Sequence, residues 1–304
     1  MALIRLPIVV AGVLLALSQA APQRFRTGVE VVRVNTLVTD GNRPIAGLTT
    51  ADFELRDRNV VQQIDSVEMA DVPVSMALVL DTSESVKGRT LTQLKSAATA
   101  AVEQLGAIDH VSLMTFNSRV RLLAGWTSSP QQVRDALQLA EAGGATSLYD
   151  AAFATLSSDD AASGNRQLIL LFSDGNDTSS WLPPSAVIER ARRSEAVVYT
   201  VALGGHSQSS LLFRRSGVEL LEPRVPPSVV TPFLTDLSNT TGGASLLASA
   251  DGLQRTFARV LGEFRTRYLL TYTPRGVEAN GWHPIEVKLK NRKGKVSARR
   301  GYLR

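Results

Sequence analysis

The middle of the chain alternates between two hydrophobic patterns. Residues 74–80 and 168–172 are continuous apolar runs, which are typical of strands buried on both faces of a sheet. Apolar residues at helical spacing follow, as in 91–105 and 133–140. Strands that alternate with helices predict a Rossmann-like α/β domain, doubly wound, with a mostly parallel sheet. We place this domain at residues 72–267.

Weaker patterns complete this α/β domain. Further strands are predicted at 111–116, 120–123, 196–203 and 245–247, and further helices at 183–192, 231–241 and 251–267. Residues 206–230 show no clear period, and we expect them to form an insertion loop.

The two ends of the chain carry a different pattern, without a helical period. Residues 21–71 contain short β-branched runs separated by turn pairs such as Asp40-Gly41. Residues 268–304 return to apolar-polar alternation and turn at 291–294. We expect both segments to form one small all-β domain into which the α/β domain is inserted. The lysines near the end are expected on the solvent side of an edge hairpin, where charge prevents aggregation.

The first residues have the features of a secretory signal peptide. Arg5 precedes an apolar run at 6–17, and small residues in Ser18-Gln19-Ala20 favour cleavage after Ala20. The signal peptide is therefore predicted at 1–20, and the protein is expected to be exported, either periplasmic or secreted. An uncleaved anchor is the alternative. No later run is long enough to span a bilayer, so we expect no integral span in the mature chain.

Composition narrows the function classes. The chain is 44% hydrophobic and 20% charged, which excludes a disordered protein and a polytopic membrane protein. It has no cysteine, which excludes disulfides, thiolate zinc sites and a cysteine nucleophile. The net charge of +5 arises at one end, because residues 288–304 carry eight basic side chains and no acidic one. Nucleic-acid binding needs a basic docking face, and we expect none.

Polar residues follow both apolar strands at the point where each strand ends. Asp81-Thr82-Ser83-Glu84-Ser85 follows the first strand, Ser173-Asp174-Gly175 follows the later one, and the glycine-rich loop 143–147 adds a hydroxyl ahead of a helix. Loops at the carboxyl ends of parallel strands converge. Two carboxylates and three hydroxyls there suit a hard cation such as Mg²⁺. The alternative is that Ser83 and Ser85 cap a helix that begins near residue 86.

These three segments resemble the loops of a von Willebrand factor A (VWA) domain, whose metal-ion-dependent adhesion site (MIDAS) uses such residues. All five metal positions of that family are matched, by Asp81, Ser83, Ser85, Thr146 and Asp174. The flanks at 29–40, 47–53, 240–243 and 268–274 resemble a bacterial exported subgroup of VWFA-related proteins. The resemblance implies a bound divalent cation, with Mg²⁺ favoured over Mn²⁺ or Ca²⁺, that accepts an acidic group of a protein or peptide partner.

Two functions remain open at this point. The first is a non-enzymatic, metal-dependent binding or adhesion module with Glu84, Asp177 and Trp181 on the rim of the ligand site. The second is a metal-assisted hydrolase or phosphatase, for which Glu84 and Asp177 are the nearby candidates for a general base. No residue is assigned as catalytic, because His110, His206 and His283 lie in no catalytic motif and no phosphate-binding glycine motif is present.

Overall fold

The computed structural model describes residues 31–41, 43–69, 72–158, 160, 163–173, 175–203 and 231–304. The predicted signal peptide with its cleavage after Ala20, the predicted metal ligand Asp174 and the predicted insertion at 206–230 lie outside these described residues. None of the helices within these ranges is long and apolar enough to cross a membrane.

A six-stranded sheet forms the centre of the α/β part, in the order β11-β10-β9-β6-β7-β8. The strands are β6 (Val74–Asp81), β7 (His110–Phe116), β8 (Val120–Thr127), β9 (Arg166–Phe172), β10 (Val197–Leu203) and β11 (Ser245–Ala248). Strands β11 to β7 run parallel, and β8 pairs antiparallel with β7. Every residue of β6 is buried, as its continuous apolar run predicts. The mostly parallel sheet is therefore observed, with one antiparallel edge strand.

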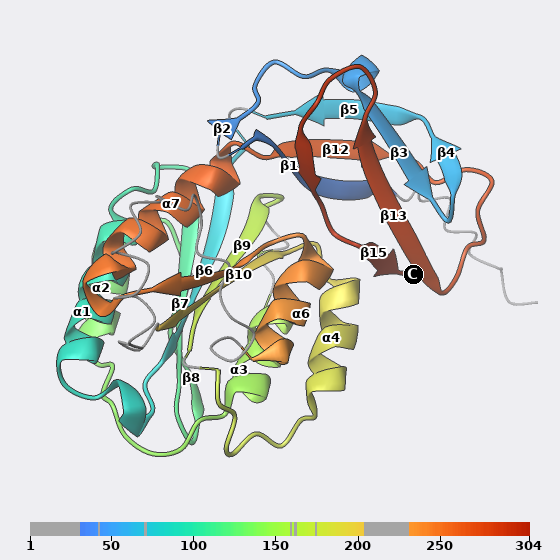
Figure 1. Cartoon of the computed structure of the whole chain (residues 1–304). Helices are drawn as coiled ribbons and strands as arrows, with labels where there is room; N and C mark the ends of the chain where they lie inside the picture. Colours follow the sequence, from blue (N-terminus) through green and yellow to red (C-terminus); the bar gives the residue numbers. More distant parts are fainter. Residues whose placement is uncertain are drawn as a thin grey trace, which may run out of the picture. The chain divides into compact units, whose positions relative to one another are not determined.

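Helices cover both faces of this sheet (Figure 1). On one face lie α1 (Arg89–Val102), α2 (Pro130–Gln138) and α7 (Leu253–Arg265), and on the other α3 (Leu148–Ser157), α4 (Pro184–Arg193) and α6 (Pro232–Thr241). Successive residues of β6 contribute to the two separate cores, with Leu78 and Leu80 in the first and Ala77 and Val79 in the second. This alternation follows from the two-residue period of a strand.

Strands from the two ends of the chain pair with each other. One sheet has the order β14-β1-β12-β5, with β2 paired to β1, and the other has the order β15-β13-β3-β4. Their bounds are β1 (Val32–Asp40), β2 (Arg43–Pro44), β3 (Phe53–Asp57), β4 (Val60–Gln62), β5 (Ile64–Glu68), β12 (Tyr268–Tyr272), β13 (Trp282–Leu289), β14 (Lys295–Ser297) and β15 (Gly301–Leu303). The pairs β1–β12 and β3–β13 are antiparallel, so segments about 230 residues apart share one core.

The expectation of a basic edge hairpin is wrong. Strand β13 lies between β15 and β3, and β14 belongs to the other terminal sheet. Lys288 and Lys290 are nevertheless exposed. Alternation of apolar and charged residues indicates a strand with one solvated face, and this condition is met by a central strand as well as by an edge strand.

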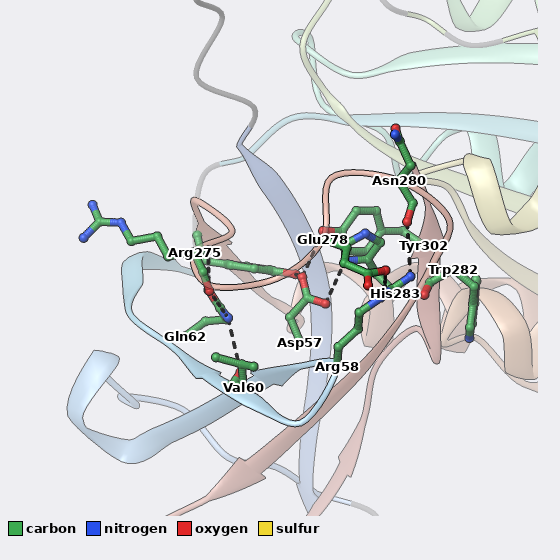
Figure 2. A network of polar contacts seen from close by, with 11 residues as sticks. Asp57, Arg58, Val60, Gln62, Arg275, Glu278, Asn280, Trp282, His283 and Tyr302 are labelled. Atoms are coloured by element: carbon green, nitrogen blue, oxygen red, sulfur yellow. Dashed lines mark hydrogen bonds and ion pairs between the residues drawn. The ribbon is translucent and has the colours of Figure 1, made fainter.

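Asp57 connects the two terminal sheets through buried hydrogen bonds (Figure 2). Its Oδ2 accepts from the hydroxyls of Tyr272 and Tyr302, each at 2.9 Å, and its Oδ1 lies 2.9 Å from Nδ1 of His283. Tyr272 is on β12, whereas Asp57, His283 and Tyr302 are on the other terminal sheet. The Asp57 carboxyl group is therefore hydrogen-bonded to residues of both terminal sheets.

Asp109 is a second buried carboxylate that joins separate elements, at the amino-terminal end of β6. Its hydrogen bonds lead us to expect a fold that is sensitive to acid. It accepts hydrogen bonds from the backbone of Val74 and Gly106 and from the guanidinium of Arg265, at 2.9, 2.7 and 2.5 Å. Burial raises the pKa of Asp109, but the hydrogen bonds from Val74, Arg265 and Gly106 outweigh burial and leave the pKa below its ordinary value. The folded state therefore favours the ionised carboxyl, and its contribution to stability is lost as pH falls below about 4.

We expect Asp109→Asn to lower the free energy of unfolding at pH 7 by about 2–3 kcal/mol, because charged hydrogen bonds to a buried acceptor are lost. The variant is also expected to lose less stability than the wild type on acidification. Urea unfolding at a series of pH values from neutral to acid measures both effects. Asp135→Asn, at an exposed position on α2, is the control. Parallel pH profiles for wild type and Asp109→Asn would contradict the assignment.

Candidate metal centre

The first loop of the candidate site begins where β6 ends. Asp81 is fully buried, and its carboxylate accepts from the Ser83 backbone N–H and the Ser173 hydroxyl, each at 2.9 Å. Ser83 is buried and Ser85 is exposed, and their hydroxyl oxygens lie 3.0 Å apart. A carboxylate fixed in orientation thus lies beside a pair of hydroxyls.

The helix-capping alternative for these serines does not fit the geometry. Ser83 precedes a short 3₁₀ turn at Glu84–Val86, but its side chain makes no capping hydrogen bond. Helix α1 begins only at Arg89, with Gly88 in the capping position. The two hydroxyls are therefore not used to start a helix.

The second loop is joined to the first by backbone hydrogen bonds. Gly143 N–H donates to the Thr82 carbonyl at 2.9 Å, and Glu84 N–H donates to the Gly144 carbonyl at 3.1 Å. Gly144 has a φ of +82°, and a Cβ there would lie 2.6 Å from Oγ of Ser118. The left-handed backbone favours glycine at this turn, and a larger residue would also have to displace the Ser118 side chain. The turn brings Thr146, which is 6% exposed, to the same edge of the sheet.

The third loop follows β9 and is bonded to the second. Thr146 N–H donates to the Thr178 hydroxyl at 2.9 Å, and the Thr146 carbonyl accepts from Thr178 and Ser179 N–H at 2.9 and 3.1 Å. The hydroxyls of Ser147 and Ser179 lie 2.9 Å apart. Asp81, Ser83 and Ser85 therefore lie on the first loop and Thr146 on the second, and hydrogen bonds join both to their neighbouring loop.

Asp177, a predicted residue of the ligand rim, is half-buried and bonded to the start of α3. Its Oδ1 accepts from the N–H groups of Leu148 and Tyr149, at 2.8 and 3.3 Å, and from the Ser180 hydroxyl at 2.5 Å. A carboxylate at the first N–H groups of α3 stabilises the helix terminus. Asp177 therefore anchors the third loop to α3, and this use weakens its candidacy as a general base.

Asp150, on α3, connects this helix back to the third loop. The sequence did not predict this role. From the first turn of α3, its carboxylate accepts from the backbone N–H groups of Trp181 and Leu182 at 3.0 Å each. The Trp181 side chain remains 95% exposed. The backbone of this tryptophan is thus fixed while its ring is presented to solvent. The spacing of Asp150 from the motif carries no local signal for this role.

Glu84, the remaining rim candidate, and the described histidines each have contacts of their own. Glu84 is exposed and pairs with Lys87 at 2.8 Å. His110 begins β7, at the opposite end of the sheet from the loops, and lies 2.7 Å from Asp160. His283 and Asp57 are both fully buried, and His206 lies outside the described residues. None of the described histidines is therefore positioned to assist chemistry at these loops.

The oxygen donors at these loops fit a hard cation. Two neighbouring ligands of an octahedral ion with bonds of about 2.1 Å lie about 3.0 Å apart, and the Ser83 and Ser85 oxygens have this separation. Asp81 supplies a carboxylate beside them. Within the described ranges, no three histidine, cysteine or acidic side chains gather into a metal cluster, so a cation at these loops would rely largely on hydroxyl oxygens.

Comparisons with known proteins agree with this architecture. The sequence profile of the von Willebrand factor type A domain matches residues 76–176. A von Willebrand factor type A protein from Catenulispora acidiphila is similar in structure, with a TM-score of 0.53 at 10% identity, over 84% of this chain and 73% of that chain. No curated protein sequence matches.

Proximal thread matrix protein 1 from the mussel byssus is also similar, with a TM-score of 0.51 at 13% identity over 68% of this chain. The match spans 50% of the mussel protein's own length. At such identities the structural likeness concerns the fold alone. With the matched profile, the parallel sheet and its helices on both faces, residues 76–176 belong to a von Willebrand factor type A domain.

Proposed function

We propose that this protein is a metal-dependent interaction module that binds an acidic group of a protein or peptide partner. The cation, Mg²⁺ in the first place and Mn²⁺ or Ca²⁺ as substitutes, is held by Asp81, Ser83, Ser85, Thr146 and Asp174. The observation that carries the proposal is the hydroxyl pair 3.0 Å apart beside a buried carboxylate. The loops that hold these groups are cross-bonded, so little ordering is needed on binding.

The donor chemistry indicates what the cation binds next. Hydroxyl ligands are neutral, so they leave most of the cation's charge uncompensated. A carboxylate from a partner is the side chain that best supplies both charge and a hard oxygen ligand. The protein would then act as a receptor for an exposed aspartate or glutamate.

Trp181 extends this site with an apolar contact. Tryptophan is enriched among the residues that contribute most to protein interfaces, and this ring is 95% exposed on a backbone fixed by Asp150. A partner would therefore place an apolar or cationic group beside the acidic one. The hydrolase alternative receives less support, since Asp177 is engaged with α3 and Glu84 with Lys87.

We also propose the setting of this module. The precursor is exported after cleavage at Ala20, and residues 21–71 and 268–304 form one β domain into which the VWA domain at 72–267 is inserted. The antiparallel pairing of β1 with β12 and of β3 with β13 supports this arrangement.

The function is tested by the binding of acidic peptides to immobilised mature protein. We expect a pool of peptides containing aspartate or glutamate to bind in Mg²⁺ and to dissociate in chelator, whereas the same pool with asparagine and glutamine does not bind. Trp181→Ala should weaken binding about tenfold, the typical loss of one interface anchor. Leu139→Ala, at another exposed apolar residue, is the matched control.

Two results would count against the binding module. Equal binding of both peptide pools in chelator would show that recognition does not depend on a metal. Turnover of a generic phosphate or ester substrate that is lost in Asp81→Ala would replace the module with the hydrolase.

A further inference from the structure

A pocket of about 360 Å³ lies away from the candidate metal loops. Arg166, which begins β9, and Ser194 and Glu195, which precede β10, line it at the amino-terminal edge of the sheet. The metal loops follow the opposite, carboxyl ends of the strands, and β9 alone separates the two edges by about 20 Å. Arg33 and Asn35 of β1 also line it.

Three lining residues carry buried polar atoms that have no hydrogen-bond partner among the described parts of the chain. These atoms are Oδ1 of Asn35, Nδ2 of Asn165 and Nε of Arg166. Asn35 is 6% exposed and Arg166 is 3% exposed, so both belong to the interior. Leaving such a group unpaired costs about 1–3 kcal/mol, and folded proteins leave few of them. All three unpaired atoms belong to residues that line the same pocket.

The charges around the pocket favour an anion. Among the described residues, four arginines line it, at positions 33, 166, 190 and 193, together with two carboxylates, Asp160 and Glu195. Arg193 also pairs with Glu189 at 3.3 Å. Asp160 is already bonded to Ser75 and His110, and Glu195 lies at a loose 3.7 Å from Arg33.

The positive charges near the pocket also affect the pKa of Arg166. Burial, followed by the charges of Arg265, Arg267 and Arg33, lowers the pKa of Arg166 to about 10. An anion in the pocket would counter this accumulation of charge. The other two guanidinium nitrogens of Arg166 donate to the carbonyls of Arg267 and Val72 at 2.8 and 3.4 Å, which fixes the side chain in place.

We propose that this pocket binds a small molecule through an oxyanion, a phosphate or carboxylate group. Arg33, Arg190 and Arg193 neutralise the anion, Asn165 and Arg166 donate hydrogen bonds to it, and Asn35 accepts one from a hydroxyl or amine elsewhere on the ligand. The volume lies in the range of small-molecule sites, about 300–1,000 Å³, so it admits more than a bare ion. This site is independent of the proposed metal-dependent function.

The test is calorimetric titration of the full mature protein with inorganic phosphate and with citrate, each at constant ionic strength. Chelator is present throughout, so that the metal loops contribute nothing. We expect saturable binding at one site per chain. The double variant Arg190→Gln/Arg193→Gln should lower the affinity at least tenfold. Asn165→Ala, which changes no charge, should lower it several-fold. The control, Arg89→Gln, removes an exposed arginine elsewhere on the domain and should bind like the wild type.

Binding of phosphate alone assigns a phosphate ligand, and binding of citrate assigns a carboxylate ligand. The proposal is overturned if neither probe saturates, or if the double variant and Asn165→Ala both bind like the wild type. An equal loss in Arg89→Gln would also overturn it, because the effect would then follow net charge rather than the pocket.

Discussion

Asp57→Ala is expected to lower the free energy of unfolding by about 3–5 kcal/mol, the range for breaking a buried polar network. The change removes the acceptor of three groups, the hydroxyls of Tyr272 and Tyr302 and the ring of His283. All four side chains are buried, so water cannot replace the lost acceptor. The effect should be large because the carboxyl group joins strands of both terminal sheets.

The two phenols remain donors over the whole physiological range. Burial, with the hydrogen bond to Asp57, raises the pKa of Tyr302 to about 12. Burial, with the nearby Tyr302 and Asp57, also raises the pKa of Tyr272. Each phenol therefore keeps its proton and needs an acceptor, and without Asp57 both are buried and unsatisfied.

Urea unfolding of the mature protein measures the loss, with two further variants for comparison. Asp57→Asn keeps one acceptor oxygen and the shape of the side chain, so it should be less damaging than the alanine. Asp65→Ala removes an exposed carboxylate that accepts one hydrogen bond, from Thr273, and should change stability by less than about 1 kcal/mol. If Asp57→Ala were no more damaging than Asp65→Ala, the network would not hold the terminal sheets together.

The sequence predicts the α/β part well because its signals are local. The apolar runs that become β6 and β9 have nearly the predicted bounds, since a strand buried on both faces has no polar position to break the run. Once these strands are parallel and their connections helical, the loops after Asp81 and Phe172 must emerge at one edge. The convergence of the candidate metal ligands follows from topology.

The terminal sheets were less predictable because their contacts are distant in sequence. The bond from Tyr302 to Asp57 spans 245 positions, and neither residue lies in a pattern that indicates the other. The position of β13 inside its sheet was not predictable for the same reason. Alternation predicts a strand with one solvated face, but it does not predict which strands lie beside it.

The rim of the candidate site shows a second limit. Asp177 lies close to the metal motif in sequence, which favoured a place on the ligand rim. Its carboxylate accepts hydrogen bonds from the first N–H groups of α3, and the carboxylate of Asp150 accepts one from the Trp181 backbone. Local spacing does not predict these two connections between the third loop and α3.

The second large effect concerns the cation. A ligand that binds only the folded state stabilises it by RT ln(1 + [L]/Kd), about 2.7 kcal/mol at a hundredfold excess. For a protein of this size, a gain of that order raises Tm by several degrees. Asp81→Ala removes the one carboxylate of the site within the described ranges, so the shift should disappear. Ser83→Ala should reduce the shift less, because water can replace a neutral hydroxyl ligand.

The reference for each variant is its own Tm in chelator. Asp81→Ala also leaves the Ser83 N–H and the Ser173 hydroxyl without their acceptor, which lowers stability with or without metal. Circular dichroism at low temperature shows whether the variant is folded. Asp135→Ala, which removes an exposed carboxylate on helix α2, is the matched control.

The most direct test of the metal site is therefore a thermal scan of wild type, Asp81→Ala, Ser83→Ala and Asp135→Ala, each in Mg²⁺ and in chelator. The proposed site predicts a rise of several degrees in wild type and Asp135→Ala, a smaller rise in Ser83→Ala and none in folded Asp81→Ala. An equal rise in wild type and Asp81→Ala, or no rise in wild type with Mg²⁺, Mn²⁺ or Ca²⁺, would contradict a metal centre at these loops.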